Sequence, residues 1–131
     1  MKFLTDDFET MLSDFYGIPK DDRGYIYMVF DSAYPGFIKV GKTTNPMKRL
    51  TAYNSDKPYN SSRYLCISKV FKESTKVEKA ILEKLYEEFN STTQKKEWFD
   101  IEAKERIIHW IQRAEEFFET TTIQLDIEEE E

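Results

Sequence analysis

The chain has 131 residues, 40% of them hydrophobic and 34% charged, with a formal net charge of −6 at pH 7. This length and composition predict one domain with a real hydrophobic core, which excludes a largely disordered protein. Its one cysteine, Cys66, excludes an intramolecular disulfide, and no apolar run is long enough for a membrane span, so we expect a cytoplasmic protein without a membrane partner.

The N-terminal residues predict a short helix in front of the main domain. Asp6 and Glu9 have the spacing of a capping box, and apolar residues follow at helical spacing until Gly17 and Pro19 end the pattern. We therefore assign residues 1–20 to an N-terminal helical extension.

Two strands are expected next. Residues 25–30 (YIYMVF) are aromatic and branched, and residues 37–41 (FIKVG) follow after a loop of hairpin length. In such a hairpin Tyr25 or Tyr27 would face Lys39, whose ammonium would favour a phenolate and lower the pKa of the tyrosine. A tyrosine of this kind can act as a general base. The same pattern is also typical of an aromatic sheet face with a lysine at its rim.

Positive charge is concentrated in the middle of this acidic chain. Residues 36–76 contain nine Lys or Arg and two acidic residues. Inside this segment Asn45 and Pro46 predict the start of a helix, with Met47 and Leu50 pointing inward. A local basic patch is either a solvated surface or a phosphate-binding surface.

The remaining residues predict a third strand and two more helices. Residues 63–71 are expected to form the strand, and one helix begins at Ser74. A short extended piece containing Trp98 and Phe99 precedes the last helix. The residues expected on the buried faces of the two helices are Val77, Ile81, Leu85, Phe89, Ile107, Ile108, Trp110, Ile111 and either Phe117 or Phe118.

The order of these elements predicts an α+β fold, in which helices flank a small three-stranded antiparallel sheet. Residues 119–131 are rich in acidic residues and are expected to form a disordered tail. The main domain would then span residues 21–118.

Five short motifs occur in a fixed order: GYIY at 24–27, KVG at 39–41, Arg49, Glu78 and EWF at 97–99. Together they resemble the GIY-YIG nuclease superfamily, specifically its phage-type branch in which the second motif begins with Lys. The resemblance covers about residues 24 to 110. It implies a three-stranded antiparallel sheet flanked by helices and a metal-dependent DNA endonuclease or nickase. A phage-encoded member would act in the host cytoplasm.

The resemblance also implies a role for each motif residue. Tyr27, with Tyr25 beside it, would prepare the attacking water with the help of Lys39. Lys42 and Arg49 would hold the scissile phosphate and neutralise the charge that develops on it. The chemistry of these side chains fits the roles, because phosphodiester hydrolysis needs cations where negative charge grows.

Glu78 would hold one Mg²⁺ or Mn²⁺ ion, since hard divalent cations prefer carboxylate oxygen. Two features leave this role open. Thr75 and Glu78 have the spacing of a capping box, and Leu82 stands where related domains often have a histidine. Further contacts with nucleic acid are expected from Thr43, Lys48, Lys57 and Arg63.

An alternative function is a catalytically inactive domain of this type that binds nucleic acid or a host protein as an effector. The sequence contains no separate DNA-reading module, so specificity would come from loops or from a protein partner. The GKTT segment at 41–44 lacks the glycine-rich loop of a nucleotide-binding site, and we expect no nucleotide cofactor.

Overall fold

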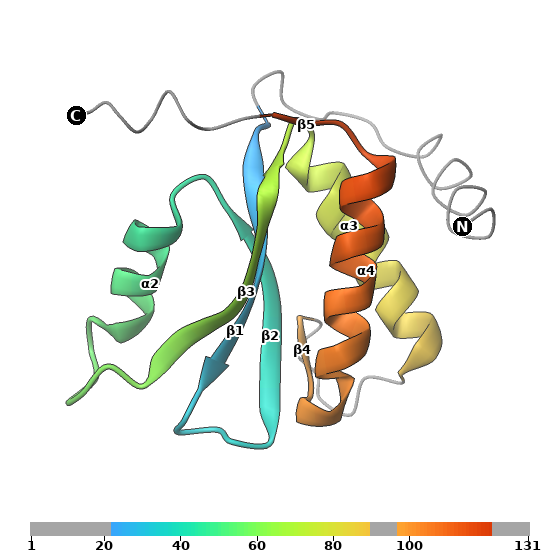
Figure 1. Ribbon diagram of the computed structural model, residues 1–131. Coiled ribbons are helices and arrows are strands. Elements are labelled where there is room, and N and C mark those ends of the chain that lie inside the picture. The colour runs from blue at the N-terminus through green and yellow to red at the C-terminus, as the bar shows by residue number, and fades with distance from the viewer. Residues whose placement is uncertain (1–21, 90–96, 122–131) are drawn as a thin grey trace, which may run out of the picture.

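The computed structural model describes residues 22–89 and 97–121 (Figure 1). The expected N-terminal helix and the acidic end of the chain from residue 122 lie outside the described residues. In chain order the elements are β1 (Gly24–Asp31), β2 (Phe37–Thr43), α2 (Pro46–Asn54), β3 (Ser62–Phe71), α3 (Ser74–Glu88), β4 (Trp98–Asp100), the 3₁₀ turn η1 (Ile101–Ala103), α4 (Lys104–Phe117) and β5 (Thr120–Thr121).

The strands form one antiparallel sheet in the order β4-β2-β1-β3-β5. The α+β class is confirmed, and β1, β2 and β3 are the three predicted strands. The predicted number of strands is wrong, because β4 extends the sheet beside β2 and β5 extends it beside β3. These added strands have only three and two residues, which is too short for an alternating pattern to appear in the sequence. β5 lies in the segment that the sequence assigned to the tail.

The two faces of the sheet carry different helices. In Figure 1, α3 and α4 cover one face and α2 lies on the other. The apolar core lies between the sheet and the α3–α4 pair, as expected for strands whose side chains alternate between faces. Its central members are Ile26, Met28, Ile38, Val40, Phe71, Val77, Ile81, Leu85, Phe99, Ile107, Trp110 and Ile111.

Helix α2 begins as predicted but packs differently. The Asn45 side chain caps it by accepting a hydrogen bond from the Lys48 N–H at 3.0 Å, and Pro46 occupies the first turn. The expectation that Met47 points inward is wrong, because its side chain is 76% exposed and no residue of α2 is buried. One contact at the start of the helix is polar: the Tyr64 hydroxyl donates to the Pro46 carbonyl at 2.8 Å. Contacts of this kind hold α2 on the sheet while its outer surface stays accessible.

The start of α3 is capped from a distance. Both side-chain oxygens of Asp22 accept hydrogen bonds from Thr75, from its N–H at 2.7 Å and its hydroxyl at 2.6 Å. The Asp22 carbonyl accepts from the N–H and the hydroxyl of Ser74. The alternative capping box between Thr75 and Glu78 does not form, because Asp22 takes its place. The carboxylate of Glu78 is therefore not used to cap the helix.

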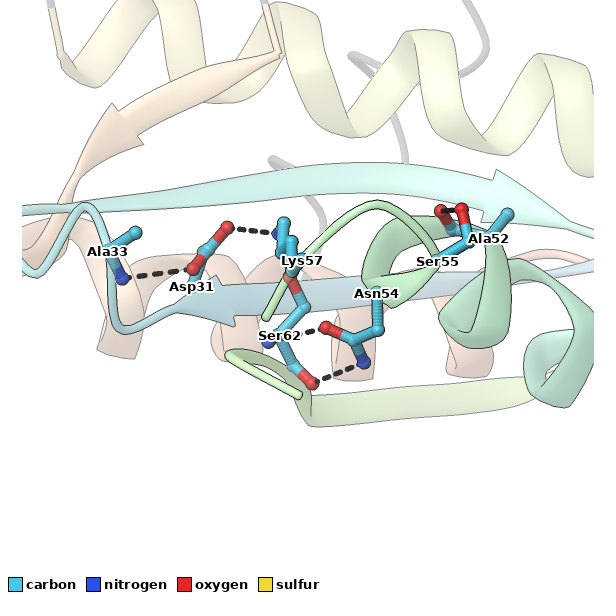
Figure 2. Close-up of polar contacts among 7 residues, drawn as sticks. All are labelled: Asp31, Ala33, Ala52, Asn54, Ser55, Lys57 and Ser62. Carbon is cyan, nitrogen blue, oxygen red and sulfur yellow. Dashed lines mark hydrogen bonds and ion pairs between the residues drawn. The ribbon is translucent and has the colours of Figure 1, made fainter. Parts of the chain in front are cut away.

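A polar network fixes the loop between α2 and β3 to the end of β1 (Figure 2). Lys57 bonds through its ammonium to the Asp31 carboxylate and to the Ser62 hydroxyl, the latter at 2.9 Å. The Asn54 amide bonds to both the N–H and the carbonyl of Ser62, at 2.9 and 3.2 Å. Burial alone would raise the pKa of Asp31, but hydrogen bonds from Lys57 and Ala33 lower it to about 2.

We predict that Asp31→Asn lowers the free energy of unfolding at pH 7 by about 1–3 kcal/mol, because Lys57 loses its charged partner. The folded pKa lies below the ordinary value of 3.8, so the stabilisation is present above pH 4 and is lost as the pH falls towards 2. Urea unfolding should show the two proteins converging over this range. A constant difference between pH 7 and pH 2 would contradict the prediction, and Asp56→Asn, at an exposed position, is the control.

Candidate functional site

Three tyrosines cluster on the α2 face of the sheet. Tyr27 of β1 is 1% exposed, and its hydroxyl lies 2.7 Å from the hydroxyl of Tyr53 on α2. The Tyr64 ring on β3 lies with its centroid 5.1 Å from that of Tyr27. Tyr27 is therefore buried, and its hydroxyl is bonded to that of Tyr53, whose side chain is only half-buried.

Gly41 makes room for this arrangement. It lies directly opposite Tyr27 in the β1–β2 ladder, and a Cβ placed on it would lie 2.5 Å from the Tyr27 hydroxyl oxygen. Any larger residue would therefore displace the phenol from Tyr53. The glycine of the KVG motif does not end the strand, since β2 continues to Thr43.

Lys39 contacts a different tyrosine from the two that the sequence predicted. Its partner across the ladder is Val29, so the expected pairing with Tyr25 or Tyr27 is wrong by the register of the hairpin. The Lys39 ammonium instead lies 5.2 Å from the centroid of the Tyr53 ring and 3.8 Å from Glu97 Oε1. Lys39 is thus attached to the aromatic cluster through α2.

The pKa of Tyr27 is raised, whereas the sequence predicted that it is lowered. Burial and the hydrogen bond with Tyr53 raise it, and the opposing effect of the Arg49 charge is smaller. The predicted lowering of this pKa by Lys39 is therefore wrong, and Tyr27 is a neutral phenol at pH 7. The Arg49 charge acts on Tyr27 from α2, where Arg49 stands one turn before Tyr53.

The pKa of Glu78 responds to the charges of the other motif residues. It lies on α3, half-buried, and its pKa is raised to about 7 by burial and by the neighbouring charge of Glu97. The positive charges of Lys42, Lys39 and Arg49 act in the opposite direction. Within residues 22–89 and 97–121, the Glu78 carboxylate has no hydrogen-bond or ion-pair partner. Its oxygens are available to a ligand.

The edge of β2 explains how residues from both faces meet. Lys39 and Gly41 share the face of Tyr27, whereas Lys42 lies opposite Ile26 and so points to the face that α3 covers. β4 pairs with β2 only along Phe37–Lys39. In the part of the chain that the structure describes, no strand covers the edge of β2 beyond that point. Side chains from the α2 face and from the α3 face can therefore approach one ligand there.

Three of the other predicted residues, Tyr25, Thr43 and Lys48, lie near this cluster in the fold or in the sequence. Tyr25 and Thr43 face each other at the end of the β1–β2 ladder next to this cluster. The Thr43 hydroxyl bonds with the backbone N–H and carbonyl of Asn45 and so shapes the turn into α2. Lys48 is exposed on α2, beside Arg49 in sequence.

Two predicted DNA-binding residues lie at the other end of β1. Lys57 is paired with Asp31, the last residue of that strand. The Arg63 guanidinium lies 5.3 Å from the centroid of the Phe30 ring. The structure does not bring Lys57 and Arg63 together with the cluster around Glu78.

Sequence reasoning missed three members of the site. Tyr53 stands four residues after Arg49, a helical spacing that places both on neighbouring positions of α2 and could have indicated it. Glu97 opens the EWF motif, in which no site residue was predicted. Tyr64 has no local signal, since only the pairing of β3 with β1 places it beside Tyr27.

The donor set fits a single hard cation bound mainly by water and substrate. Among the residues that the structure describes, none bonds to the carboxylate oxygens of Glu78, and a divalent cation would offset the cost of burying that charge. In the described ranges no three His, Cys, Asp or Glu side chains group together as a metal site. Mg²⁺ commonly binds proteins through one or two carboxylates and keeps several waters, so one glutamate is sufficient.

The fold and the cluster define a small α+β domain that gathers tyrosines, cations and a carboxylate at one edge of an antiparallel sheet. Comparison with protein families matches residues 24–125 to the T5orf172 domain. The chain belongs to this family, which is a phage-associated domain of the GIY-YIG/HNH-like nuclease-related set. Neither the curated proteins nor the solved structures include a significant match. Among the described residues, no helix has the length and apolar character needed to cross a bilayer.

We predict that Glu78→Gln stabilises the metal-free protein at pH 8. The folded pKa of about 7 exceeds the ordinary 4.5, so folding favours the protonated carboxyl. Its stabilising contribution is complete below pH 4.5 and is lost as the pH rises through 7. The amide cannot ionise, and its advantage at pH 8 should reach about 1 kcal/mol after solvent screening.

Urea unfolding in EDTA at pH 4.5 and pH 8 measures this difference. Glu83→Gln, at an exposed position on the same helix, should show no such dependence on pH. A Glu78→Gln protein that is no more stable than wild type at pH 8 would contradict the raised pKa.

Proposed function

We propose that the chain is a metal-dependent DNA endonuclease or nickase of GIY-YIG type. The observation that carries this proposal is the half-buried carboxyl of Glu78 at the uncovered edge of β2, where the charges of Lys42, Lys39 and Arg49 act on it. Within the described residues the Glu78 carboxylate has no bonded partner, and such a carboxylate with three cations acting on it suits a phosphate group together with a divalent cation. Membership of a phage-associated, nuclease-related family supports the proposal.

The cations would bind the phosphodiester and stabilise its transition state. In-line attack on phosphorus places extra negative charge on the non-bridging oxygens, where fixed ammonium and guanidinium groups lower the barrier. Within the described residues Lys42 and Arg49 have no ion-pair partner, so their charges are available to a substrate. Lys48 extends the positive surface along the exposed side of α2.

The tyrosine pair would orient the attacking water. The Tyr53 hydroxyl is bonded to the Tyr27 hydroxyl, and each phenol can still accept or donate one further hydrogen bond. Because Tyr27 is buried, Tyr53 is the phenol that would contact the water. Glu78 would hold the divalent cation. When bound, Mg²⁺ or Mn²⁺ acts as a Lewis acid on the phosphate and lowers the pKa of a coordinated water.

A second candidate function is a nucleic-acid-binding domain without catalysis, or an effector that binds a host protein. Two observations favour it. The pKa of Tyr27 is raised, which is unfavourable for a general base, and Leu82 packs against the core where related domains often have a histidine. In either case a protein partner could supply sequence specificity. A phage-encoded protein would act in the host cytoplasm.

We predict that the protein nicks supercoiled plasmid DNA in the presence of Mn²⁺ or Mg²⁺ and not in EDTA. Arg49→Ala and Glu78→Gln should each lower the rate by about 100-fold or more, because each removes charge that the transition state requires. Both positions contribute little to the core, so circular dichroism should show folded variants. Gel analysis of nicked product against time gives the rates.

Lys79→Ala and Glu83→Gln are matched controls, since both positions are exposed on α3 and neither contributes to the cluster. Both controls should cut at the wild-type rate. A folded Arg49→Ala protein that cuts normally would remove Arg49 from the proposed mechanism. A wild-type protein that binds DNA and never cuts it would favour the second candidate.

Binding of DNA to the Glu78→Gln variant should weaken steeply with salt. Lys39, Lys42, Lys48 and Arg49 are four cations, and counterion release predicts a slope of about −3 to −4 in log affinity against log salt. Lys48→Ala should reduce the slope by about 1. Fluorescence anisotropy at several salt concentrations measures it. Lys69→Ala is the control, and an unchanged slope in Lys48→Ala would show that α2 does not contact DNA.

A further inference from the structure

Lys39 is held between two groups that come from different elements. Its ammonium lies 3.8 Å from Glu97 Oε1 and 5.2 Å from the centroid of the Tyr53 ring. Tyr53 belongs to α2, and Glu97 immediately precedes β4. The lysine ammonium therefore links the aromatic cluster on one face of the sheet to the edge at which β4 begins.

The backbone of Glu97 is fixed relative to Lys39. The Val40 N–H donates to the Glu97 carbonyl at 3.0 Å, and the next residue, Trp98, pairs with Lys39 in the β2–β4 ladder. The Glu97 carboxylate thus starts from a backbone position set by the same strand that carries Lys39. A carboxylate placed in this way can define the position of an ammonium group.

We propose that Glu97 is a positioning residue that holds the Lys39 ammonium beside the Tyr53 ring. The catalytic consequence rests on the proposed function, whereas the placement of Lys39 does not. Lys39 adds a third positive charge to those of Lys42 and Arg49 that act on Glu78. Glu97 gives that charge a partner that is not the proposed metal ligand.

The need for such a partner follows from the physical properties of lysine. Its side chain is a flexible four-carbon chain that ends in a compact charge, and an aromatic face attracts a cation without fixing its position closely. Glu78 is a second carboxylate within electrostatic reach of Lys39. Without the Glu97 carboxylate, the ammonium would lose this ion pair and would no longer be fixed beside the Tyr53 ring.

The placement of Lys39 can be measured without any activity assay. Reductive methylation with ¹³C-formaldehyde keeps the positive charge, and each dimethyl-lysine gives one signal in a ¹H–¹³C spectrum. The Lys39 signal, assigned by its loss in Lys39→Arg, should differ from those of exposed lysines because it lies near the Tyr53 ring. In Glu97→Gln it should shift towards the exposed lysines, while the control Glu102→Gln, at an exposed position in η1, should leave it unchanged. An unshifted Lys39 signal in a folded Glu97→Gln protein would overturn the proposal.

The dependence of Glu97 on Lys39 is tested by combining variants. Glu97→Gln should lower kcat for nicking by about 10- to 100-fold with KM for DNA changed less, as is usual when the partner of a site residue is lost. In a Lys39→Met background the same substitution should change kcat less than about twofold, because the residue that it positions is absent. Equal losses in both backgrounds would show that Glu97 does not act through Lys39 and would overturn the proposal. If wild type never cuts DNA, the proposed function fails, and the methyl signal alone decides the position of Lys39.

Discussion

The contact between the Tyr27 phenol and Gly41 determines how the site is built. Only a residue without a side chain leaves space for the ring beside β2, and this placement brings the Tyr27 hydroxyl to 2.7 Å from the Tyr53 hydroxyl. Helix α2 contributes no buried residue, so polar and aromatic contacts of this kind take the place of a hydrophobic interface. Arg49 lies on the same helix, one turn before Tyr53. The position of the guanidinium therefore depends on one glycine in a neighbouring strand.

Charged side chains reach the edge of β2 from both faces of the sheet. The α2 face supplies Lys39 and Arg49, and the other face supplies Lys42 and the carboxylate of Glu78. Burial raises the pKa of that carboxyl to about 7, while the three cations lower it. Two of the cations have no protein partner within the described residues, and the third is paired with Glu97. This excess of unpaired positive charge supports the proposal that the site binds a phosphate with a divalent cation.

The sequence predicted the elements better than their pairing. The alternation in β1 to β3, the Asn-Pro start of α2 and the apolar face of α3 are local patterns, and all were confirmed. The register that places Lys39 opposite Val29 depends on the hairpin as a whole. If β2 were shifted by one residue against β1, each residue would have a different cross-strand partner. Asp22 caps α3 from more than fifty residues away, which no spacing rule detects. Motif order named the charged residues Lys39, Lys42, Arg49 and Glu78, whose electrostatic interactions the structure relates to one another, and their functional role stays a prediction. Tyr64 and Glu97 could be found only from the folded sheet.

Helix α2 is attached at its two ends rather than along its length. Asn45 and the Tyr64 hydroxyl hold its first turn, and Asn54 with the following Lys57 joins its end to β1 and β3 (Figure 2). Between these attachments the outward positions, such as Met47 and Thr51, contribute nothing to the core. They can therefore change with little cost in stability while Arg49 and Tyr53 stay in place. Sequence change on this surface would not require repacking of the domain.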